Sequence, residues 1–436
     1  MTRTKVAGVA GLASLALVLT ACGGSSGGGD STAASSGGGS SASAGGASGT
    51  VTMWARDNEK GFINLLADAY NKSHKAQVKV TVVPAANFVQ KFGTASASGS
   101  GPDIASIDLV YLPYFASKGV LEDITDVQNS LPYKDSLSPA HRKLATYQGK
   151  TYALPFTAEA SVTFWNKDLF KKAGLDPEKP PTNYAEMLAD AKAIRALGGD
   201  TYGFTMAGQC GGCNVFEFAP HVWASGGDIL SEDGKTAKLD SPEVTDALTF
   251  YHDMAAAGVM PPAAKTDNGT AQAAAFQSGK VGMVNLGAFF VQTLNADKKV
   301  DFGATPIVGK TGGTASFAGG DEIAVTKGAK NKAAAAEFVK WATDEEAQTI
   351  LAKNAIVPVR TDLTDKIYAP LDPRYKVLGD AMSKGRTPYS VVENAIINDN
   401  NGPWAKLLNT AVFGNDVKGA QATAQKAAQQ IIDQGN

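Results

Sequence analysis

The sequence predicts an α/β fold with two lobes, and three observations lead to this prediction. From Thr50 onward, short strand-like apolar runs alternate with stretches of helical periodicity, which is typical of parallel sheets covered by helices. The chain has 436 residues, which is too many for one simple core and enough for two ordinary domains. The sequence contains no internal repeat. We therefore expect two lobes rather than one large unit.

Three strands and a helix are expected at the start of the folded region. The strands are predicted at Val51–Trp54, Val78–Val83 and Asp103–Ile107 from their apolar runs. Between the first two, apolar side chains recur at helical spacing, which predicts a buried helix face made of Phe62, Leu65, Leu66, Ala69 and Tyr70.

Capping signals indicate where later helices begin. Asn183 stands three residues before Glu186, which predicts a capping box and a helix that continues through Leu197. Ser241, which is followed by a proline, predicts the start of another helix.

A third capping signal lies inside a longer helical pattern. Thr343 and Glu346 have capping-box spacing, but the helical stretch around them begins near Asn331. A further strand is expected at Val281–Val284, and a last helix, rich in Ala and Gln, at Asp416–Gln434.

The N-terminal residues have the layout of a secretion signal. Two basic residues precede an apolar run at Val6–Val18, which is shorter than the roughly 20 residues of a transmembrane helix. The next four residues, Leu-Thr-Ala-Cys, resemble the bacterial lipobox, in which cleavage leaves a lipidated cysteine as the first residue. We predict a signal peptide at residues 1–21 and lipidation of Cys22. The alternative is an ordinary secretion signal with an incidental cysteine.

Residues 22–49 predict a flexible tether. After Cys22 they are almost entirely Gly, Ser and Ala, so they cannot build a core. A chain of this length and composition spans roughly 30 Å. The folded part is therefore expected at the extracellular face of the cell membrane, anchored by its lipid.

Composition and motifs exclude several classes of function. The formal net charge of −2 provides no basic patch of the size that nucleic acid requires. The four histidines lack zinc-ligand spacing, and no Gly-Lys-Thr run has the earlier glycine of a phosphate-binding loop. A Gly-x-Ser-x-Gly match occurs only in the tether. We expect no metal, no cofactor, no nucleic-acid partner and no enzyme activity.

Cys210 and Cys213 are separated by two glycines. Outside the cell such a pair is usually oxidised, and a disulfide that closes so short a loop contributes only about 2 kcal/mol. Thioredoxin-like redox sites open a helix, whereas the glycines here favour a loop. A disulfide is the main prediction, and free thiols or a catalytic or metal-bound pair are the alternatives.

Several short motifs occur in a characteristic order. The most recognisable is Phe164–Leu175, which is close to the sequence YNKDLFKKAGL. The others are, in order, Gly101–Ile104, Ala116–Leu121, Gly149–Pro155, Pro180–Thr182, Ala224–Gly227, Phe276–Met283, Gly319–Gly320 and Val357–Arg360. This order resembles extracellular solute-binding protein family 1, the maltodextrin-binding type of ABC-importer receptor, from about Val51 to the C-terminus. One departure is Asn183-Tyr184, where the family usually has Trp.

The resemblance implies a two-lobed periplasmic-binding-protein fold of type II, with the ligand in a cleft between lobes that a multi-strand hinge joins. By correspondence, residues 51–158 plus 318–372 form one lobe, and residues 159–317 plus 373–436 form the other. The resemblance also implies a monomeric receptor. Such a receptor closes around its ligand and delivers it to the permease subunits of an ABC importer.

Candidate ligand contacts follow from the chemistry of an uncharged sugar. Its C–H faces need aromatic platforms and its hydroxyl rim needs polar side chains, both found where strands end at a domain interface. For Trp223 and Phe289 the resemblance also implies a stacking role. The candidates are Trp54, Arg56, Asp57, Asn58, Asp108, Glu159, Trp223, Asn285, Gly287, Phe289, Gly320, Asp321, Glu322 and Arg360.

Structural roles compete with these assignments. Trp54 and Trp223 are also suited to packing against the core, Arg56 to pairing with a carboxylate, and Phe290 competes with Phe289 for one position. The predicted function is capture of a sugar, foremost an oligosaccharide, for import. The alternatives are a receptor of the same fold for another polar solute such as a polyol phosphate or a peptide, a secreted glycosidase with paired carboxylates, and a structural or adhesive lipoprotein.

Overall fold

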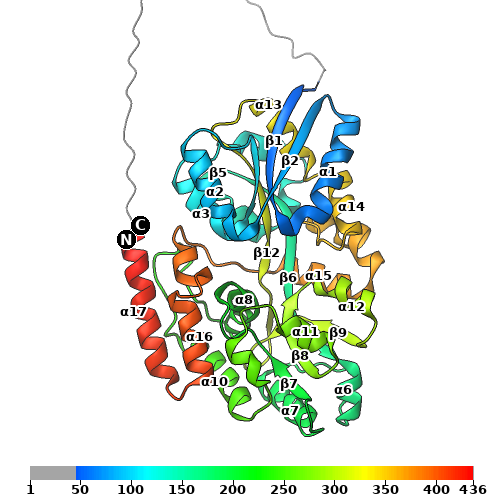
Figure 1. The fold of residues 1–436 in the computed structure, drawn as a ribbon, viewed down its shortest axis with the longest axis vertical. Coiled ribbons are helices and arrows are strands. Elements are labelled where there is room, and N and C mark those ends of the chain that lie inside the picture. Colours follow the sequence, from blue (N-terminus) through cyan, green and yellow to red (C-terminus); the bar gives the residue numbers. More distant parts are fainter. Residues whose placement is uncertain (1–45, 436) are drawn as a thin grey trace, which may run out of the picture. The chain divides into compact units, whose positions relative to one another are not determined.

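The computed structural model describes residues 46–435, in which eight strands form one large sheet (Figure 1). The predicted signal peptide, Cys22 and most of the predicted tether lie outside the described residues. The strands of the sheet are, in spatial order, β2 (Ala76–Val83), β1 (Gly49–Arg56), β3 (Ile104–Asp108), β12 (Ala318–Val325), β6 (Leu154–Asn166), β8 (Val281–Gly287) and β7 (Tyr202–Thr205), with β9 (Phe302–Thr305) beside the end of β6.

The sheet is mixed, whereas the sequence predicts a parallel one. β1 pairs parallel with β2 and β3, and β7 pairs parallel with β8. β12, however, is antiparallel to both β3 and β6, and β6 is antiparallel to β8. The prediction fails there because it considered only consecutive strands, whereas β12 joins β3 and β6 from far along the chain.

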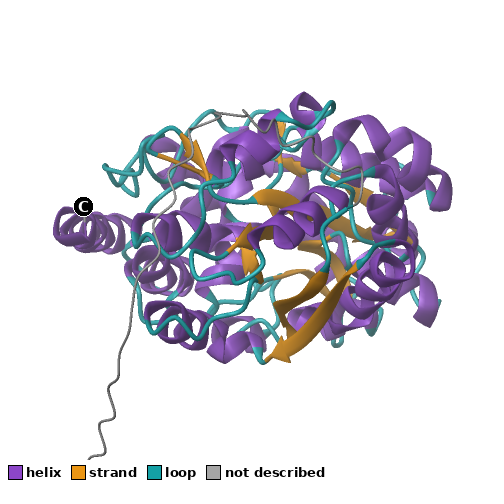
Figure 2. Ribbon diagram, turned by 90° about the horizontal axis from the view of Figure 1, so that it is seen from above, coloured by secondary structure: helices purple, strands orange, loops and turns teal. Residues whose placement is uncertain are grey.

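β6 connects the two ends of the sheet. Its first residues pair with β12, and from Ser161 onward it pairs with β8. All but one of its residues are buried, because the strand is covered on both faces. Figure 1 shows β6 and β12 running between the two groups of strands, and Figure 2 shows helices on either side of the strands.

Helices occupy the connections between these strands. They are α1 (Lys60–Ser73), α2 (Ala85–Ala97), α3 (Leu112–Ser117), α4 (Thr125–Asn129), α5 (Pro139–Leu144), α6 (Lys167–Lys172), α7 (Tyr184–Arg195), α8 (Gly211–Glu217), α9 (Ala219–Ala224), α10 (Pro242–Ala256), α11 (Gln272–Gln277), α12 (Phe290–Asp297), α13 (Lys332–Trp341), α14 (Glu345–Lys353), α15 (Pro373–Ser383), α16 (Pro403–Phe413) and α17 (Val417–Gly435). Short paired strands are β4 (Thr146–Tyr147) with β5 (Lys150–Thr151), and β10 (Ile307–Val308) with β11 (Thr314–Ala315). None of the helices among residues 46–435 is long and apolar enough to cross a membrane.

Two predicted helix starts are confirmed. The Asn183 Oδ1 atom accepts a hydrogen bond of 3.0 Å from the Glu186 amide, and the Ser241 Oγ atom accepts one from the Val244 amide. These bonds satisfy N–H groups that the helix itself leaves unpaired. The first of these helices ends at Arg195, two residues before the predicted end.

The third capping signal is one residue off. The helical stretch from Asn331 is two helices, and the second is capped by Asp344, whose Oδ1 atom accepts from the Ala347 amide. The Thr343 hydroxyl instead donates back to the Lys340 carbonyl oxygen, so it closes the first helix. Two competent capping residues stand side by side here, and the chain reversal decides between them.

The buried face of α1 differs from the prediction, which included Leu65 and Ala69 and missed Ile63 and Ala67. Its buried residues are Phe62, Ile63, Leu66, Ala67 and Tyr70, which lie on one stripe at spacings of three and four. Leu65 is 48% exposed because it lies next to this stripe rather than on it. One apolar cluster extends from α1 along β6 to Phe164, so the core is continuous across the sheet.

Candidate functional site

A cavity of about 480 Å³ lies where the carboxyl ends of β1 and β3 meet β6 and β12. Ends of strands in an α/β sheet leave a crevice of this kind, because the following loops diverge to opposite faces. Seven of the predicted ligand residues line it together. The lining consists of Arg56, Asn58, Glu59, Phe62, Asp108, Thr157, Ala158, Glu159, Ala288, Phe289, Gly320, Asp321, Ala355 and Ile356.

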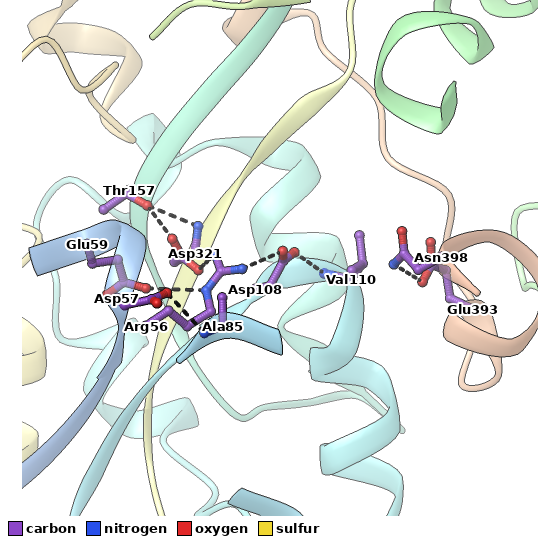
Figure 3. A network of polar contacts seen from close by, with 10 residues as sticks. All are labelled: Arg56, Asp57, Glu59, Ala85, Asp108, Val110, Thr157, Asp321, Glu393 and Asn398. Atoms are coloured by element: carbon purple, nitrogen blue, oxygen red, sulfur yellow. Dashed lines mark hydrogen bonds and ion pairs between the residues drawn. The ribbon is translucent and has the colours of Figure 1, made fainter. Parts of the chain in front are cut away.

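Arg56 is the centre of the polar network in this cavity (Figure 3). Its Nη1 atom donates to the Asp108 Oδ2 atom at 2.9 Å, and its Nη2 atom donates to Asp321. Its Nε atom lies 3.5 Å from the Glu59 Oε1 atom. The guanidinium therefore joins the ends of β1 and β3 to the middle of β12, and the Arg56 side chain is only 14% exposed.

The strand register places the two aspartates beside each other. Asp321 on β12 stands directly opposite Asp108 on β3. The Asp321 carboxylate also accepts from the Thr157 hydroxyl at 3.1 Å, and the same hydroxyl accepts from the Asp321 amide. Two like charges this close need a shared cation, which Arg56 supplies.

Gly320 is required where β12 crosses β6. Its φ of +124° favours glycine, and a Cβ atom there would lie 2.0 Å from the Thr157 carbonyl oxygen. The two strands therefore approach closely enough to place Thr157 against Asp321. Gly320 contributes backbone rather than a side chain to the cavity wall.

Three carboxyl groups of the cavity, Glu159, Glu59 and Asp321, have raised pKa values. Burial raises the pKa of Glu159 to about 8, and the nearby Asp321 and Asp108 add to this effect. Burial and Asp321 likewise raise the pKa of Glu59 well above its usual value, against the opposing effect of Arg56. Burial alone would lower the pKa of Arg56, but Asp321, Asp108 and Glu59 raise it above its usual value, so this side chain stays charged.

Two carboxyl groups of the cavity wall each have one buried oxygen without a hydrogen-bond partner among the described residues. They are the Oε2 atom of Glu59, a residue that is 1% exposed, and the Oε1 atom of Glu159. Gly287, another predicted residue, adjoins the second atom: a Cβ atom there would lie 2.1 Å from Glu159 Oε1 and 2.6 Å from the Phe289 ring. A side chain at position 287 would therefore clash with both, so glycine lets Glu159 and Phe289 pack against its backbone.

Phe289 provides an exposed aromatic face at the cavity. Its side chain is 51% exposed, although large apolar side chains are usually buried. Phe290, the competing candidate, is 1% exposed and packs against Phe164 in the core. The structure thus assigns Phe289 to the cavity and Phe290 to packing, because Phe289 precedes the first turn of α12 and Phe290 begins it.

Four other predicted residues do not line the cavity. Trp54 packs against the apolar cluster around Phe92, and the exposed Asp57 accepts a hydrogen bond from the Ala85 amide at the start of α2. Arg360 lies over the Tyr133 ring at 3.9 Å and pairs with the neighbouring Asp362. Glu322 is fully buried, because neighbouring residues on a strand point to opposite faces and Asp321 faces the cavity.

Asn285 belongs to a buried network rather than to the cavity wall. Its Oδ1 atom accepts from the Thr163 hydroxyl, and its amide nitrogen lies within 3.1 Å of Tyr251 Oη and 2.9 Å of His221 Nε2. The His221 Nδ1 atom lies 2.7 Å from the Val308 carbonyl oxygen. These bonds satisfy buried polar groups, and they give Asn285 a structural role.

Trp223 lines a second cavity of about 210 Å³ instead of the first. It is 6% exposed, its Nε1 atom donates to the Asp228 carboxylate at 2.9 Å, and the Arg386 guanidinium lies 5.6 Å from its ring. The ring also stacks against Phe317. These contacts correspond to the packing alternative stated for Trp223.

Sequence reasoning missed several residues of the cavity. Glu59 and Phe62 follow Arg56 by three and six residues, so a search that continued past the strand into the first helical turn would have found them. Thr157, Ala288, Ala355 and Ile356 carry no such signal. Glu393 is also close by: it is 2% exposed, and burial together with Asp108 raises its pKa well above its usual value (Figure 3).

Cys210 and Cys213 form a disulfide. The two glycines between them do not form a loop as expected, because α8 begins at Gly211 and follows β7. The Cys210 sulfur accepts from the Cys213 amide at 3.1 Å and so caps this helix. Across residues 46–435, no group of three or more His, Cys, Asp or Glu side chains is arranged to hold a metal ion.

Comparison with known proteins relates the whole described region to one group. The family profile described as bacterial extracellular solute-binding protein matches residues 56–349. The diacetylchitobiose binding protein DasA of Streptomyces coelicolor is 27% identical over 425 residues, covering 94% of this chain and 95% of that protein. The maltotriose-binding protein of Pyrococcus abyssi is 24% identical over 77% of this chain and 72% of its own length.

A solved structure agrees with this relationship. The cyclic alpha-maltosyl-1,6-maltose binding protein of Arthrobacter globiformis superposes with a TM-score of 0.77 at 25% identity. The match covers 89% of this chain and all of the other protein.

Proposed function

The chain belongs to the bacterial extracellular solute-binding protein family, and on this basis we propose that it captures a sugar in the cavity around Arg56 and Phe289 and delivers it to an ABC importer. It has the α/β periplasmic-binding-protein fold, and it is a receptor rather than an enzyme. An oligosaccharide is the foremost ligand, since relatives are named for diacetylchitobiose, maltotriose and a cyclic maltose derivative.

The observation that carries the proposal is the composition of the cavity wall. The exposed Phe289 ring offers a surface for the C–H face of a sugar, and Asn58, Asp108 and Glu159 offer groups for its hydroxyls. A polyol phosphate fits less well. Among the described residues of the lining, Arg56 is the only cation, and three of its five N–H groups already face carboxyl groups.

Capture requires that the cavity close around the ligand. The wall combines residues from both predicted lobes: Arg56 and Asp108 come from residues 51–158, and Phe289 comes from residues 159–317. We propose that the lobes move about β6 and β12, and that the importer permease recognises the closed form.

The lipid anchor is a further part of the proposal. Cleavage after residue 21 and lipidation of Cys22 would keep the receptor at the membrane on its tether, close to the importer. A Cys22→Ser variant should then appear in the culture medium instead of the membrane fraction. Retention of this variant at the membrane would contradict the anchor.

A thermal-shift screen over mono-, di- and trisaccharides tests the sugar. A ligand at one hundred times its Kd stabilises the folded state by about 2.7 kcal/mol, which raises the melting temperature measurably. Isothermal calorimetry on each positive sugar then gives the affinity. The proposal fails if no sugar raises the melting temperature while another class of small solute does, or if the protein hydrolyses a glycoside.

A further inference from the structure

The wall of the cavity around Arg56 carries an excess of acidic groups. It includes four carboxyl side chains, Glu59, Asp108, Glu159 and Asp321, against the single guanidinium of Arg56. All three kinds of guanidinium nitrogen face carboxylates: Nε lies near Glu59, Nη1 binds Asp108 and Nη2 binds Asp321. Three of the five N–H groups of Arg56 therefore already face carboxyl groups of the protein itself.

Two of the carboxyl groups point to a missing cationic partner. Glu59 is 99% buried, and its Oε2 atom has no hydrogen-bond donor among the described residues, although the residue lines the cavity. The Glu159 Oε1 atom is also buried without a hydrogen-bond donor among the described residues. A buried carboxyl oxygen without a donor costs about 1–3 kcal/mol. Glu322 and Glu393 also have such oxygens, but Glu59 and Glu159 line the cavity, where a ligand can supply the donor.

Glu159 and the Phe289 ring meet at the backbone of Gly287. A Cβ atom at this position would lie 2.1 Å from Glu159 Oε1 and 2.6 Å from the Phe289 ring, so only glycine lets both side chains pack there. A ligand group that binds Glu159 from the cavity would thus lie beside an aromatic ring, and such rings attract cations.

We propose that the ligand is a sugar or polyol that bears a protonated amine, and that the ammonium group binds Glu159 and Glu59. This inference rests on the proposed function and narrows its substrate class. It departs from the uncharged sugar that sequence reasoning suggests. An ammonium group supplies the donors that both carboxyl oxygens lack, and its charge compensates the carboxylate that forms when a proton is released on binding.

Binding of the ammonium group should release protons. Burial raises the pKa of Glu159 to about 8 and also raises the pKa of Glu59, and a cation placed against the two groups lowers both pKa values. The other groups that face them are Asp321, Asp108 and Arg56, while Glu393 faces Asp108 and the Tyr368 hydroxyl lies near Glu159. The affinity for an amine should accordingly fall as the pH is lowered, because protons compete with the ligand.

Matched sugars test the inference. The probes are β-1,4-linked glucose, N-acetylglucosamine and glucosamine oligomers of one to three units, which differ only in the hydroxyl, acetamide or amine at carbon 2. Calorimetry at about pH 6.5, where a sugar amine is protonated, is run in two buffers of different ionisation enthalpy to count the protons released. The amine should bind at least tenfold more tightly than its hydroxyl and acetamide counterparts, with net proton release.

Two variants locate the effect. Glu159→Gln and Glu59→Gln keep the side-chain size but remove the charge, so each should reduce the preference for the amine at least tenfold. Glu178→Gln is the control with the same charge change, because Glu178 is 70% exposed and pairs with Lys167 outside the cavity. It should leave the preference unchanged.

Three results would overturn the inference. They are failure of every amine to bind, equal or tighter binding of a neutral counterpart, and binding of the amine without proton release. If neutral sugars bind and amines do not, the proposed sugar-receptor function is supported and only the amine-bearing ligand is refuted. If no sugar of any series binds but another solute does, the sugar-receptor function and the amine-bearing ligand are both refuted.

Discussion

Replacement of Glu159 by glutamine should change how the stability of the ligand-free protein depends on pH. The pKa of Glu159 is about 8 in the folded protein, compared with 4.5 for the exposed group. The folded state therefore holds a proton that the unfolded state loses. Its stability should fall as the pH rises from about 4.5 to about 8. Glutamine cannot ionise, so this loss disappears from the variant.

The size of the effect follows from the two pKa values. The difference is 8 − 4.5, or about 3.5 pKa units, and each unit corresponds to about 1.4 kcal/mol. The upper limit is therefore about 5 kcal/mol, and water that enters the cavity should reduce it to about 2–5 kcal/mol. The amide of glutamine also changes the free energy of unfolding, but this change is independent of pH and cancels when the two pH values are compared.

Urea unfolding at about pH 5 and about pH 9 measures the effect. The free energy of unfolding of Glu159→Gln, relative to the wild type, should rise by about 2–5 kcal/mol between the two pH values. The same measurement on Glu178→Gln, an exposed residue, should show no comparable rise. If the wild type and Glu159→Gln change in parallel with pH, the reasoning about the buried carboxyl group is refuted.

Three further predictions follow from the contacts of the site. Arg56→Met should lower the free energy of unfolding at neutral pH by about 3–5 kcal/mol, because it leaves the buried Asp321 and the partly exposed Asp108 without their shared cation. A loss below about 1 kcal/mol in urea unfolding would contradict this. Phe289→Ala should weaken sugar binding about thirtyfold with little change in melting temperature, since the ring is 51% exposed. The control Leu371→Ala, whose side chain is 50% exposed outside the cavity, should change neither the affinity nor the melting temperature. Normal affinity of Phe289→Ala in calorimetry would exclude stacking of this ring on the sugar. Trp223→Ala should destabilise the fold by about 3–5 kcal/mol in urea unfolding and leave the calorimetric affinity within a few-fold of the wild type. Weakened sugar binding with unchanged stability would instead place Trp223 in the ligand site.

Local signals in the sequence were sufficient for much of the fold. The strands at Val51–Trp54 and Val78–Val83 and the helix caps at Asn183 and Ser241 are all confirmed. These features depend on side-chain periodicity and on hydrogen bonds within four residues, which the sequence displays directly. The one-residue error at Thr343 arose where two capping residues are adjacent and only the packing of the turn selects one.

Part of the candidate site could also be predicted from the sequence, because some of its residues stand where predicted strands end. Arg56 and Asp108 end parallel strands that share an edge, so a rule about strand ends brought them together correctly. Trp223 and Arg360 also follow recognisable motifs, but they contact Asp228 and Tyr133 rather than the cavity. A motif fixes the position of a residue along the chain and does not fix the direction of its side chain.

By itself, the sequence determined the fold class, the family and the residue types available for binding, because periodicity, capping and motif order are properties of neighbouring residues. Only the tertiary structure decided which of those residues meet. β12 pairs antiparallel with β3, which places Asp321 opposite Asp108 and directs the buried Glu322 to the other face of the sheet. That register depends on contacts between segments more than two hundred residues apart, and a one-residue shift would reverse every side chain of the strand.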